Sequence, residues 1–261
     1  MWYVVCMKIG YMQYSPIVGD KEKNLETIKR LINNVSGDIF VLPEMGLAGY
    51  PDATKERLVE HSEKLDGYLI TELTKIAKDN DTCIIVGMPE IDGDNVYNTT
   101  VAVGPDGLIA YHQKSHLFME EKNNFTPGTN KPTLFEWKNN KIGIGVCYDY
   151  MFPEFWRKLA LDGAQLFCNT ANFFSEYGFP VMRTRSIENG VFSITTNRVG
   201  MDGEQRYNGG SEIVDNRGNI LMKASDEEEV KIIEVDLSKS DDKNWNSIND
   251  LMADRREELY N

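Results

Sequence analysis

The sequence predicts a layered α/β protein with mixed β-sheets. Segments with apolar residues at helical spacing alternate with short apolar runs that are typical of buried strands. Two turn sequences, Pro105-Asp106-Gly107 and Asp215-Asn216-Arg217-Gly218, predict hairpins between neighbouring strands. Alternating helices and strands favour parallel pairing, whereas hairpins require antiparallel pairing, so both kinds are expected within the same sheets.

Helices are expected where apolar residues recur at intervals of three and four. In the first of them Leu25, Ile28 and Ile32 fall on one face. Pro153 opens another, because proline suits the first helical turn. The four helices with clear signals cover residues 20–34, 66–79, 153–161 and 182–189.

Strands are expected where short apolar runs end at turn residues. The predicted strands cover residues 2–9, 38–42, 82–88, 97–103, 108–113, 141–146, 165–169, 191–196, 211–214 and 220–222. The apolar start, Met1 to Met7, lacks a basic segment and a small-residue cleavage site, so we interpret it as the first strand and not as a signal peptide. The tail beyond Asp241 is strongly polar, and its main apolar residues are Leu251, Met252, Leu259 and Tyr260.

Length and charge limit the classes of protein that the chain can represent. Its 261 residues contain no linker or repeat, so a single domain over 1–261 is expected. The net charge of −13 disfavours nucleic acid and anionic membrane surfaces as partners. No run of eighteen apolar residues occurs, and we expect no transmembrane helix.

The four cysteines are Cys6, Cys83, Cys147 and Cys168. None belongs to a C-x-x-C pair or has metal-type spacing with a histidine. Cys6, Cys83 and Cys168 lie in apolar strand-like runs and are expected to be buried small hydrophobic residues. The pattern fits a reducing, cytoplasmic compartment.

Cys147 has a different context from the other three cysteines. It ends a strand rich in Ile, Val and Gly, and a turn then leads to the helix that begins at Pro153. This order is typical of a nucleophile elbow, and the positive end of the following helix would lower the pKa of the thiol. The context alone leaves two interpretations equally open, a catalytic nucleophile or one more buried strand cysteine.

Two charged residues also follow predicted strands directly. Glu44 comes after an apolar run and Pro43, and a carboxylate held against apolar surroundings has the raised pKa of a general base. Lys114 ends another strand and could bind negative charge that develops on a substrate oxygen. Taken alone, Glu44 would be a solvated loop residue or a helix cap, and Lys114 a surface lysine. Strand ends favour catalysis because they hold side chains rigidly at the rim of a cleft.

Three segments in order resemble the signature segments of the nitrilase superfamily, the carbon–nitrogen hydrolase family. They are Leu42-Pro43-Glu44, Lys114 with His116-Leu117-Phe118, and Gly145-Val146-Cys147-Tyr148-Asp149. Gaps of 70 and 33 residues separate the glutamate, lysine and cysteine. The resemblance extends to about residue 236 through Tyr97-Asn98-Thr99 and residues 125–128, 152–154, 197–200 and 209–211. Each segment is weak evidence, but the ordered set is specific.

The resemblance implies a four-layer α-β-β-α sandwich with two mixed β-sheets, and subunits that pair into an eight-layer homodimer. It implies no metal and no organic cofactor. Glu44 would take the thiol proton while Cys147 attacks the carbonyl or nitrile carbon. Lys114 and the backbone N–H of Tyr148 would stabilise the oxyanion. Glu44 would then protonate departing ammonia and activate the water that releases the acid.

The resemblance also implies a second glutamate shortly after the lysine. Glu121, seven residues past Lys114, matches that position better than Glu120. We expect Glu121 to position its neighbours and to keep Lys114 charged, because Glu44 must take up and release protons in each cycle. The alternative is an ordinary solvated loop carboxylate.

The expected substrate is a small, linear, neutral or weakly polar amide. Tyr148, Asn172 and Phe174 are expected to contact it, since the segment from Asn172 to Gly178 should lie beside Cys147. That segment offers aromatic rings and an amide but no cation for a substrate carboxylate, which ranks N-carbamoyl amino acids lower. Arg183 or Arg198 could still reach the pocket.

Several alternatives stay open. The same triad would serve a true nitrilase or a hydrolase of N-carbamoyl amino acids or amines. The short loop after Lys114 resembles compact archaeal and bacterial members more than ω-amidases. From other classes, the chain could be a non-catalytic binding protein of the same fold, a papain-like enzyme using His112 or His116, or, less well supported, a metal hydrolase.

Overall fold

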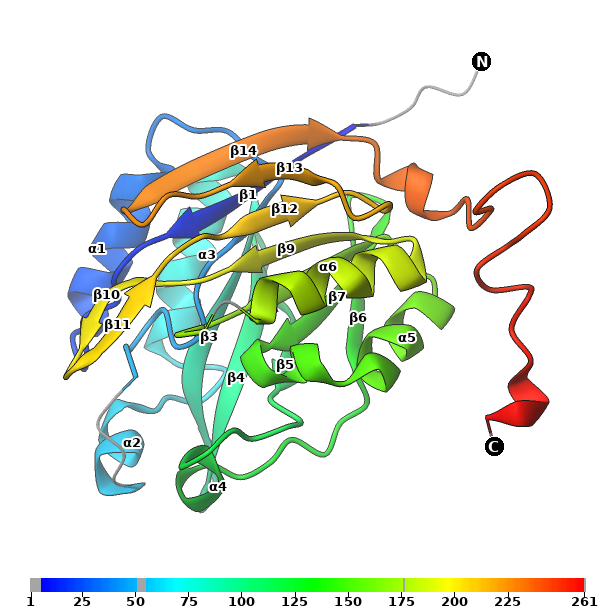
Figure 1. The fold of residues 1–261 in the computed structure, drawn as a ribbon. Helices are drawn as coiled ribbons and strands as arrows, with labels where there is room; N and C mark the ends of the chain where they lie inside the picture. Colours follow the sequence, from blue (N-terminus) through cyan, green and yellow to red (C-terminus); the bar gives the residue numbers. More distant parts are fainter. Residues whose placement is uncertain (1–5, 51–54, 176, 261) are drawn as a thin grey trace.

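The computed structural model describes residues 6–50, 55–175 and 177–260. Two six-stranded β-sheets pack face to face, and helices cover the outer face of each sheet (Figure 1). The order of layers is therefore α-β-β-α. Both sheets contain parallel and antiparallel pairs, so the predicted α/β sandwich with two mixed sheets is confirmed.

The first sheet has the strand order β14-β1-β2-β3-β4-β5. The neighbours β1, β2 and β3 pair in parallel, and the remaining neighbours pair antiparallel. Its strands are β1 (Met7–Gln13), β2 (Ile39–Val41), β3 (Cys83–Asp92), β4 (Asn95–Gly104), β5 (Gly107–Gln113) and β14 (Glu229–Val235).

The second sheet repeats this plan with the order β13-β12-β9-β8-β7-β6. Here β7, β8 and β9 are the parallel strands, flanked by antiparallel neighbours. Its strands are β6 (Thr133–Trp137), β7 (Asn140–Val146), β8 (Leu166–Thr170), β9 (Phe192–Thr196), β12 (Glu212–Val214) and β13 (Ile220–Lys223). A separate hairpin joins β10 (Val199–Asp202) to β11 (Gln205–Asn208).

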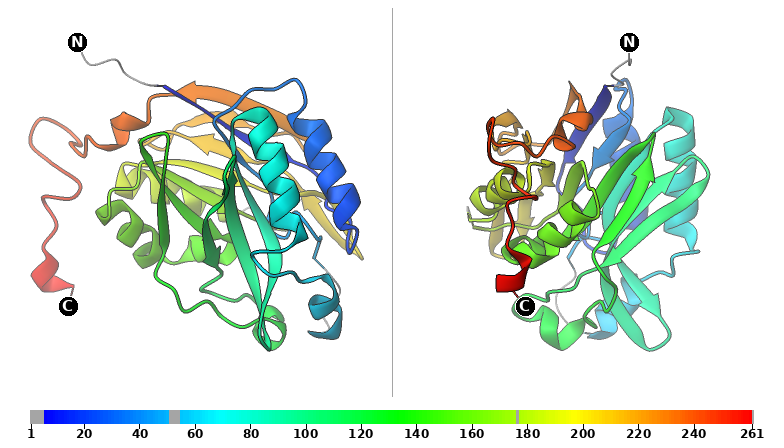
Figure 2. Two further views of the ribbon diagram at one scale, coloured as in Figure 1. Left: turned by 180° about the vertical axis from the view of Figure 1, so that it is seen from behind. Right: turned by 90° about the vertical axis from the view of Figure 1, so that its right-hand side faces the viewer.

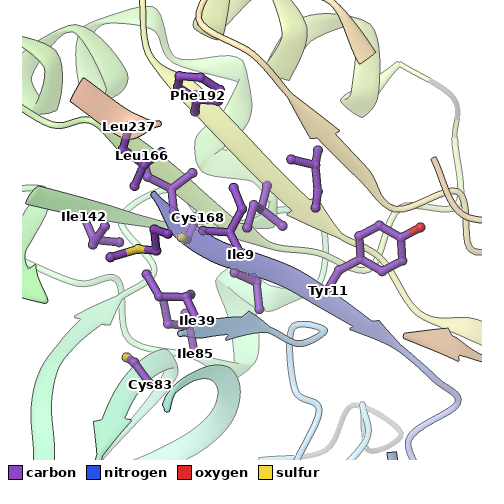
Figure 3. Packing of buried hydrophobic residues seen from close by; sticks show 14 of the residues in the cluster. Ile9, Tyr11, Ile39, Cys83, Ile85, Ile142, Leu166, Cys168, Phe192 and Leu237 are labelled. Carbon is purple, nitrogen blue, oxygen red and sulfur yellow. The ribbon is translucent and has the colours of Figure 1, made fainter. Parts of the chain in front are cut away.

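The main core lies between the two sheets (Figure 3). Ile9 and Cys83 from the first sheet and Ile142 and Cys168 from the second are completely buried there. The prediction that Cys83 and Cys168 are buried small hydrophobic residues is thus confirmed. The prediction for Cys6 is wrong, because this residue precedes β1 and is exposed.

Two further apolar clusters attach the outer helices. Helices α1 (Lys21–Ile32) and α3 (Tyr68–Asn80) pack on the first sheet through residues such as Ile28 and Leu73. Helices α5 (Pro153–Leu161) and α6 (Gly178–Asn189) cover the second sheet (Figure 2). Trp156 of α5 lies against Phe167 of β8 there. Burial of these apolar faces stabilises the layers, since each side chain of this size contributes about 1.5–3 kcal/mol.

The structure differs from the sequence-based prediction in a few elements. Helix α6 begins at Gly178, four residues before the predicted start. Residues 2–5 of the first predicted strand lie outside the described residues, and β1 continues past its predicted end at residue 9 to Gln13. The elements without a sequence-based prediction are α2 (Lys55–His61), α4 (Glu121–Asn124), β6, β10, β11 and β14.

The chain ends in a tail that runs past α5 and α6 (Figures 1 and 2). Lys243 Nζ donates to the carbonyl oxygens of Asn189 and Gly190 at the end of α6. Met252 packs on the apolar cluster beneath α5 and α6. In the three described ranges, no helix combines the length and apolar character that crossing a membrane requires.

Candidate active site

The three residues of the predicted triad lie just beyond the carboxyl ends of β2, β5 and β7. The structure brings Glu44, Lys114 and Cys147 to one cavity of about 280 Å³, and Glu121 lines the same cavity. Strand ends hold these side chains on rigid backbone, which is the placement expected for residues that must keep a fixed geometry.

The loop that carries Glu44 passes very close to β3. Gly87 N donates to Pro43 O at 3.1 Å, and Leu47 N donates to Gly87 O at 3.2 Å. A Cβ at residue 87 would lie 2.7 Å from Glu44 Cα and would overlap the backbone nitrogen of Met45. Glycine is therefore required at this strand position for the loop to approach.

Lys114 is held in a buried position beside β4. Its backbone N–H donates to Asn98 O at 2.8 Å, and its carbonyl accepts from Gly128 N at 2.9 Å. Only 1% of the side chain is exposed. A buried ammonium needs acceptors close by, and two carboxylates supply them.

Lys114 Nζ lies 2.8 Å from Glu44 Oε1 and 2.7 Å from Glu121 Oε1. Glu121 Oε1 also accepts a short hydrogen bond from Tyr50 Oη, and Glu121 Oε2 accepts from Phe118 N at 2.6 Å. Both oxygens of Glu121 are therefore occupied by donors. Among the described residues, no hydrogen bond reaches Glu44 Oε2.

A second contact links the two carboxylates. Asn98 Nδ2 donates to Glu44 Oε1 at 2.7 Å and lies 3.2 Å from Glu121 Oε1. Asn98 is completely buried on β4. The cluster therefore joins one ammonium, one amide and two carboxylates around the Oε1 atoms.

Cys147 begins a short 3₁₀ helix, Cys147–Met151, directly after β7. Its φ of +40° is a left-handed conformation that is uncommon for a residue other than glycine. Such backbone persists only where the surrounding structure enforces it, and it is frequent at active sites. The sharp turn from strand to helix agrees with the predicted nucleophile elbow.

Asp149 fixes the turn that follows Cys147. Its Oδ2 accepts from Val146 N at 3.0 Å, and its Oδ1 lies 2.7 Å from His116 Nδ1. His112 Nε2 lies 3.4 Å from Oδ2. Burial alone would raise the pKa of Asp149, but hydrogen bonds from the histidines bring it down to about 2. Both histidines thus pair with Asp149, which argues against the papain-like alternative.

Burial is the largest single influence on the pKa values of the site residues. It raises the pKa of Glu44, although the Lys114 ammonium opposes this shift. Burial would lower the pKa of Lys114, but the charges of Glu44, Cys147 and Glu121 raise it overall, so this side chain stays protonated. These groups interact strongly, and their titration belongs to the cluster as a whole.

The thiol of Cys147 has a raised pKa. Burial is the largest cause, followed by the nearby Glu44 carboxylate; Lys114 and the backbone N–H of Asn172 act in the opposite direction. The net direction is opposite to the lowering that sequence analysis expected from the following helix. The helix α5 begins six residues after Cys147, with the 3₁₀ turn between them. Burial and the Glu44 carboxylate thus both favour the protonated form of the Cys147 thiol.

The cavity has an aromatic wall. Tyr148, Asn172 and Phe174 line it as the sequence predicted. Phe118 packs against Tyr148 with ring centroids 4.8 Å apart. The aromatic residues that line the cavity are Tyr50, Phe118, Tyr148, Tyr150, Phe173, Phe174 and Tyr207.

Within the described part of the chain, Lys114 is the only cation that lines this cavity. Arg183 lies instead against Glu212, with Nε 3.4 Å from Oε2. Arg198 pairs with Asp202 at 3.2 Å and stacks on Tyr207. Neither arginine therefore offers a free charge to a substrate carboxylate in the cavity.

Sequence analysis missed three residues of the site. Asn98 belongs to the Tyr97-Asn98-Thr99 segment that carries part of the family resemblance, but sequence analysis gave it no role in the site. Tyr50 lies in the loop after Glu44, and nothing in its local sequence distinguishes it. Tyr207 lies on the unpredicted hairpin of β10 and β11. In the ranges that the structure describes, no three His, Cys, Asp or Glu side chains are grouped as a metal site.

The chain belongs to the carbon–nitrogen hydrolase family, whose model matches residues 8–243. A relative named nitrilase from Pyrococcus abyssi is 37% identical over 97% of this chain and 99% of its own length. An (R)-stereoselective amidase from a Pseudomonas species is 33% identical, covering 88% of this chain and 85% of its own. A CN-hydrolase superfamily structure from Xanthomonas campestris, with an arsenic adduct in its active site, has a TM-score of 0.83 and 26% identity, covering 91% and 93% of the two chains.

Proposed function

We propose that the protein is a thiol hydrolase that cleaves a non-peptide carbon–nitrogen bond of a small linear amide. The products are ammonia and a carboxylic acid, formed through an acyl-enzyme on Cys147. The observation that carries this proposal is the meeting of Cys147, Glu44 and Lys114 in one buried cavity. A binding protein of the same fold would have no need to bury these ionisable groups together.

In the first half of the reaction Glu44 Oε2 accepts the thiol proton as Cys147 Sγ attacks the carbonyl carbon. The raised pKa of Glu44 suits a group that accepts and returns a proton near neutral pH. Lys114 and the backbone N–H of Tyr148 stabilise the oxygen that becomes negative. The C–N bond then breaks, and Glu44 delivers its proton to the departing ammonia.

In the second half a water molecule takes the place of ammonia. Glu44 removes a proton from this water as the oxygen attacks the thioester carbon. The carboxylic acid leaves, and the proton returns to Cys147. Proton transfer thus runs through one carboxylate in both halves, and no cofactor is needed.

Glu121 acts as a positioning carboxylate in this scheme. Four donors surround its oxygens, from Tyr50, Asn98, Lys114 and Phe118. Held in this way, Glu121 stays within hydrogen-bond distance of Lys114, whose pKa it helps to raise, while Glu44 changes its charge.

The lining of the cavity favours neutral amides. Tyr148, Asn172 and Phe174 would contact the substrate, and Lys114 is already paired with two carboxylates. N-carbamoyl amino acids rank lower because their carboxylate would lack a cationic partner. A nitrile is the second candidate, since the relative from Pyrococcus abyssi is named a nitrilase.

We also infer the setting in which the enzyme works. Residues 1–261 form one catalytic domain, and two copies form a homodimer in which the tail beyond residue 241 takes part. The four cysteines are free thiols, which suits a reducing cytoplasm. The small-molecule substrate is the partner, with no part for nucleic acid or membrane.

An ammonia-release screen over small amides, N-carbamoyl amino acids and nitriles tests the proposal. Neutral amides should be turned over best, with ammonia and acid formed in equal amounts. A carbamoyl amino acid preferred by about a hundred-fold over every neutral amide would overturn the substrate ranking. Absence of ammonia from all three classes would overturn the proposed activity.

A further inference from the structure

Asn98 lies between the two carboxylates of the site, and the mechanism described so far uses it only as one of the donors to Glu121. Its Nδ2 donates to Glu44 Oε1 at 2.7 Å and lies 3.2 Å from Glu121 Oε1. The amide group has two N–H bonds, so each carboxylate can receive one. The side chain is completely buried, and water cannot replace either contact.

The orientation of the Asn98 amide leaves its oxygen without a hydrogen bond, and the two carboxylates explain why this orientation is kept. Asn98 Oδ1 is buried and has no hydrogen-bond partner among the described residues. Buried acceptors without partners are rare, and each one in a folded protein calls for a physical reason. Rotating the amide by half a turn would place Oδ1 against two carboxylate oxygens, where lone pairs repel. The contacts to Glu44 and Glu121 therefore fix the orientation.

The hydrogen bond from Asn98 makes the two carboxylate oxygens of Glu44 different from each other. Its Oε1 accepts from both Asn98 Nδ2 and Lys114 Nζ, whereas no hydrogen bond from a described residue reaches its Oε2. A proton on Oε1 would have to displace one of these donors. A proton on Oε2 displaces nothing, so the two oxygens are chemically different although the carboxylate itself is symmetric.

We propose that Asn98 is a positioning residue that, together with Lys114, holds Glu44 so that only Oε2 exchanges protons with Cys147 and the leaving group. This inference rests on the proposed function, in which Glu44 is the proton carrier. An amide suits the task because it donates whether Glu44 is charged or neutral, and it adds no charge of its own.

The backbone around Asn98 is rigid enough for this role. The residue lies within β4, between β3 and β5, and its carbonyl accepts from Lys114 N at 2.8 Å. The same residue therefore contacts Lys114 through its backbone and Glu44 through its side chain. The hydrogen bond from Asn98 also lowers the pKa of Glu44, against the larger effect of burial, which raises it.

The test compares Asn98→Ala with Asn98→Asp. Asn98→Ala removes the donor, and we expect kcat/KM to fall about tenfold to a hundredfold. The ionised form of Glu44 loses a hydrogen bond, its pKa rises, and the acidic limb of the pH profile moves to higher pH by about one unit. Asn98→Asp keeps the shape but presents a third acceptor to two carboxylates, so it should be worse than Asn98→Ala. A packing role predicts the reverse order.

Thr99→Val is the matched control on the same strand. It removes the buried hydrogen bond from Thr99 Oγ1 to Glu90 Oε2, on the opposite face of β4. It should lower the melting temperature while leaving the acidic limb at the wild-type pH. If Asn98→Ala does not fold, Asn98→Ser retains one donor and should show a smaller shift in the same direction.

Alkylation of Cys147 by iodoacetamide gives a second readout that needs no substrate. The acidic limb of its rate should move with that of turnover in Asn98→Ala. An acidic limb at the wild-type pH in both assays, or higher activity in Asn98→Asp than in Asn98→Ala, would overturn the role of Asn98. A different result would separate the two proposals. If the wild type releases no ammonia, but the acidic limb of Cys147 alkylation lies at higher pH in Asn98→Ala than in the wild type, the proposed function fails and the positioning role stands.

Discussion

At the scale of single residues, the two buried glutamates differ in what their oxygens contact. Glu121 is surrounded by four donors, whereas Glu44 shares one oxygen with Lys114 and Asn98 and leaves the other free of described donors. A carboxylate whose oxygens are all engaged is a poor proton carrier. These contacts support the proposal that Glu44 carries the proton and that Glu121 holds Lys114 in place.

Glu121→Gln and Glu44→Gln should separate these roles. We expect Glu121→Gln to lower kcat by about a hundredfold, because it misplaces Lys114 and the substrate. In Glu121→Gln, iodoacetamide should alkylate Cys147 at neutral pH at a rate close to that of the wild type. Glu44→Gln should slow alkylation as well, since it removes the acceptor of the thiol proton. Steady-state kinetics measure the effect on turnover, and iodoacetamide titration measures the effect on alkylation. A wild-type rate of turnover in Glu121→Gln would remove Glu121 from the mechanism.

The raised pKa of Cys147 has a direct spectroscopic consequence. Because burial and Glu44 both favour the protonated form, the thiol should stay neutral at pH 7 and through about pH 9. The measurement is the ultraviolet thiolate absorbance of the wild type minus that of Cys147→Ala, which cancels the other cysteines. A thiolate signal from Cys147 at pH 7 would show that charge stabilisation outweighs burial in this site.

At the scale of elements, the close approach of β3 to the Glu44 loop makes Gly87 a sensitive position. Gly87→Ala should push the loop away, because the new Cβ meets the backbone of Glu44 and Met45. We expect a loss of about 1–3 kcal/mol in the free energy of unfolding and about a hundredfold in kcat. In Gly143→Ala the nearest atom is the movable Leu159 side chain at 2.9 Å, so kcat should change far less. Wild-type kcat in Gly87→Ala would contradict this account.

The helices and strands that the local sequence predicted are those whose own residues show helical spacing or a short apolar run. Sequence analysis placed Glu44, Lys114 and Cys147 directly after three predicted strands, and the structure brings these residues to one cavity. Strand β14 was missed because its residues are mostly half-buried at a sheet edge and its pairing with β1 joins Met7 to Val235. A contact between such distant segments leaves no local periodicity.

The parts of the site that sequence missed depend on similar long-range contacts. Tyr50 reaches Glu121 across 71 positions, and Asn98 reaches Glu44 across 54. The four-residue helix α4 that starts at Glu121 is too short to show amphipathic spacing. Glu121 could be predicted only from its position after Lys114 in the ordered family segments. The residues that donate hydrogen bonds to it are known only from the fold.

At the scale of the whole molecule, most residues of the tail beyond residue 241 are exposed to solvent. Met252 packs against the apolar cluster of α5 and α6, but Ile248, Leu259 and Tyr260 are 86%, 63% and 66% exposed. Exposed apolar residues at one end of the molecule agree with the proposal that a second copy covers them.

Light scattering at micromolar concentration tests the proposed dimer. We expect twice the 29.8 kDa mass of one chain. The double variant Leu259→Ser with Tyr260→Ser should weaken dimerisation at least about tenfold, because it removes apolar contact area without touching the cavity. A species of one chain alone in the wild type would refute the dimer.

The most direct test of the central claim compares ammonia release from a small amide by the wild type and by Cys147→Ala. Cys147→Ala should lose activity by a factor on the order of 10⁶, the scale for removal of a nucleophile, with an unchanged melting temperature. Cys168→Ala, at a fully buried position in the core, should lose about 1–2 kcal/mol of stability but keep its kcat. Ammonia release by Cys147→Ala at the wild-type rate would contradict the assignment of Cys147 as the nucleophile.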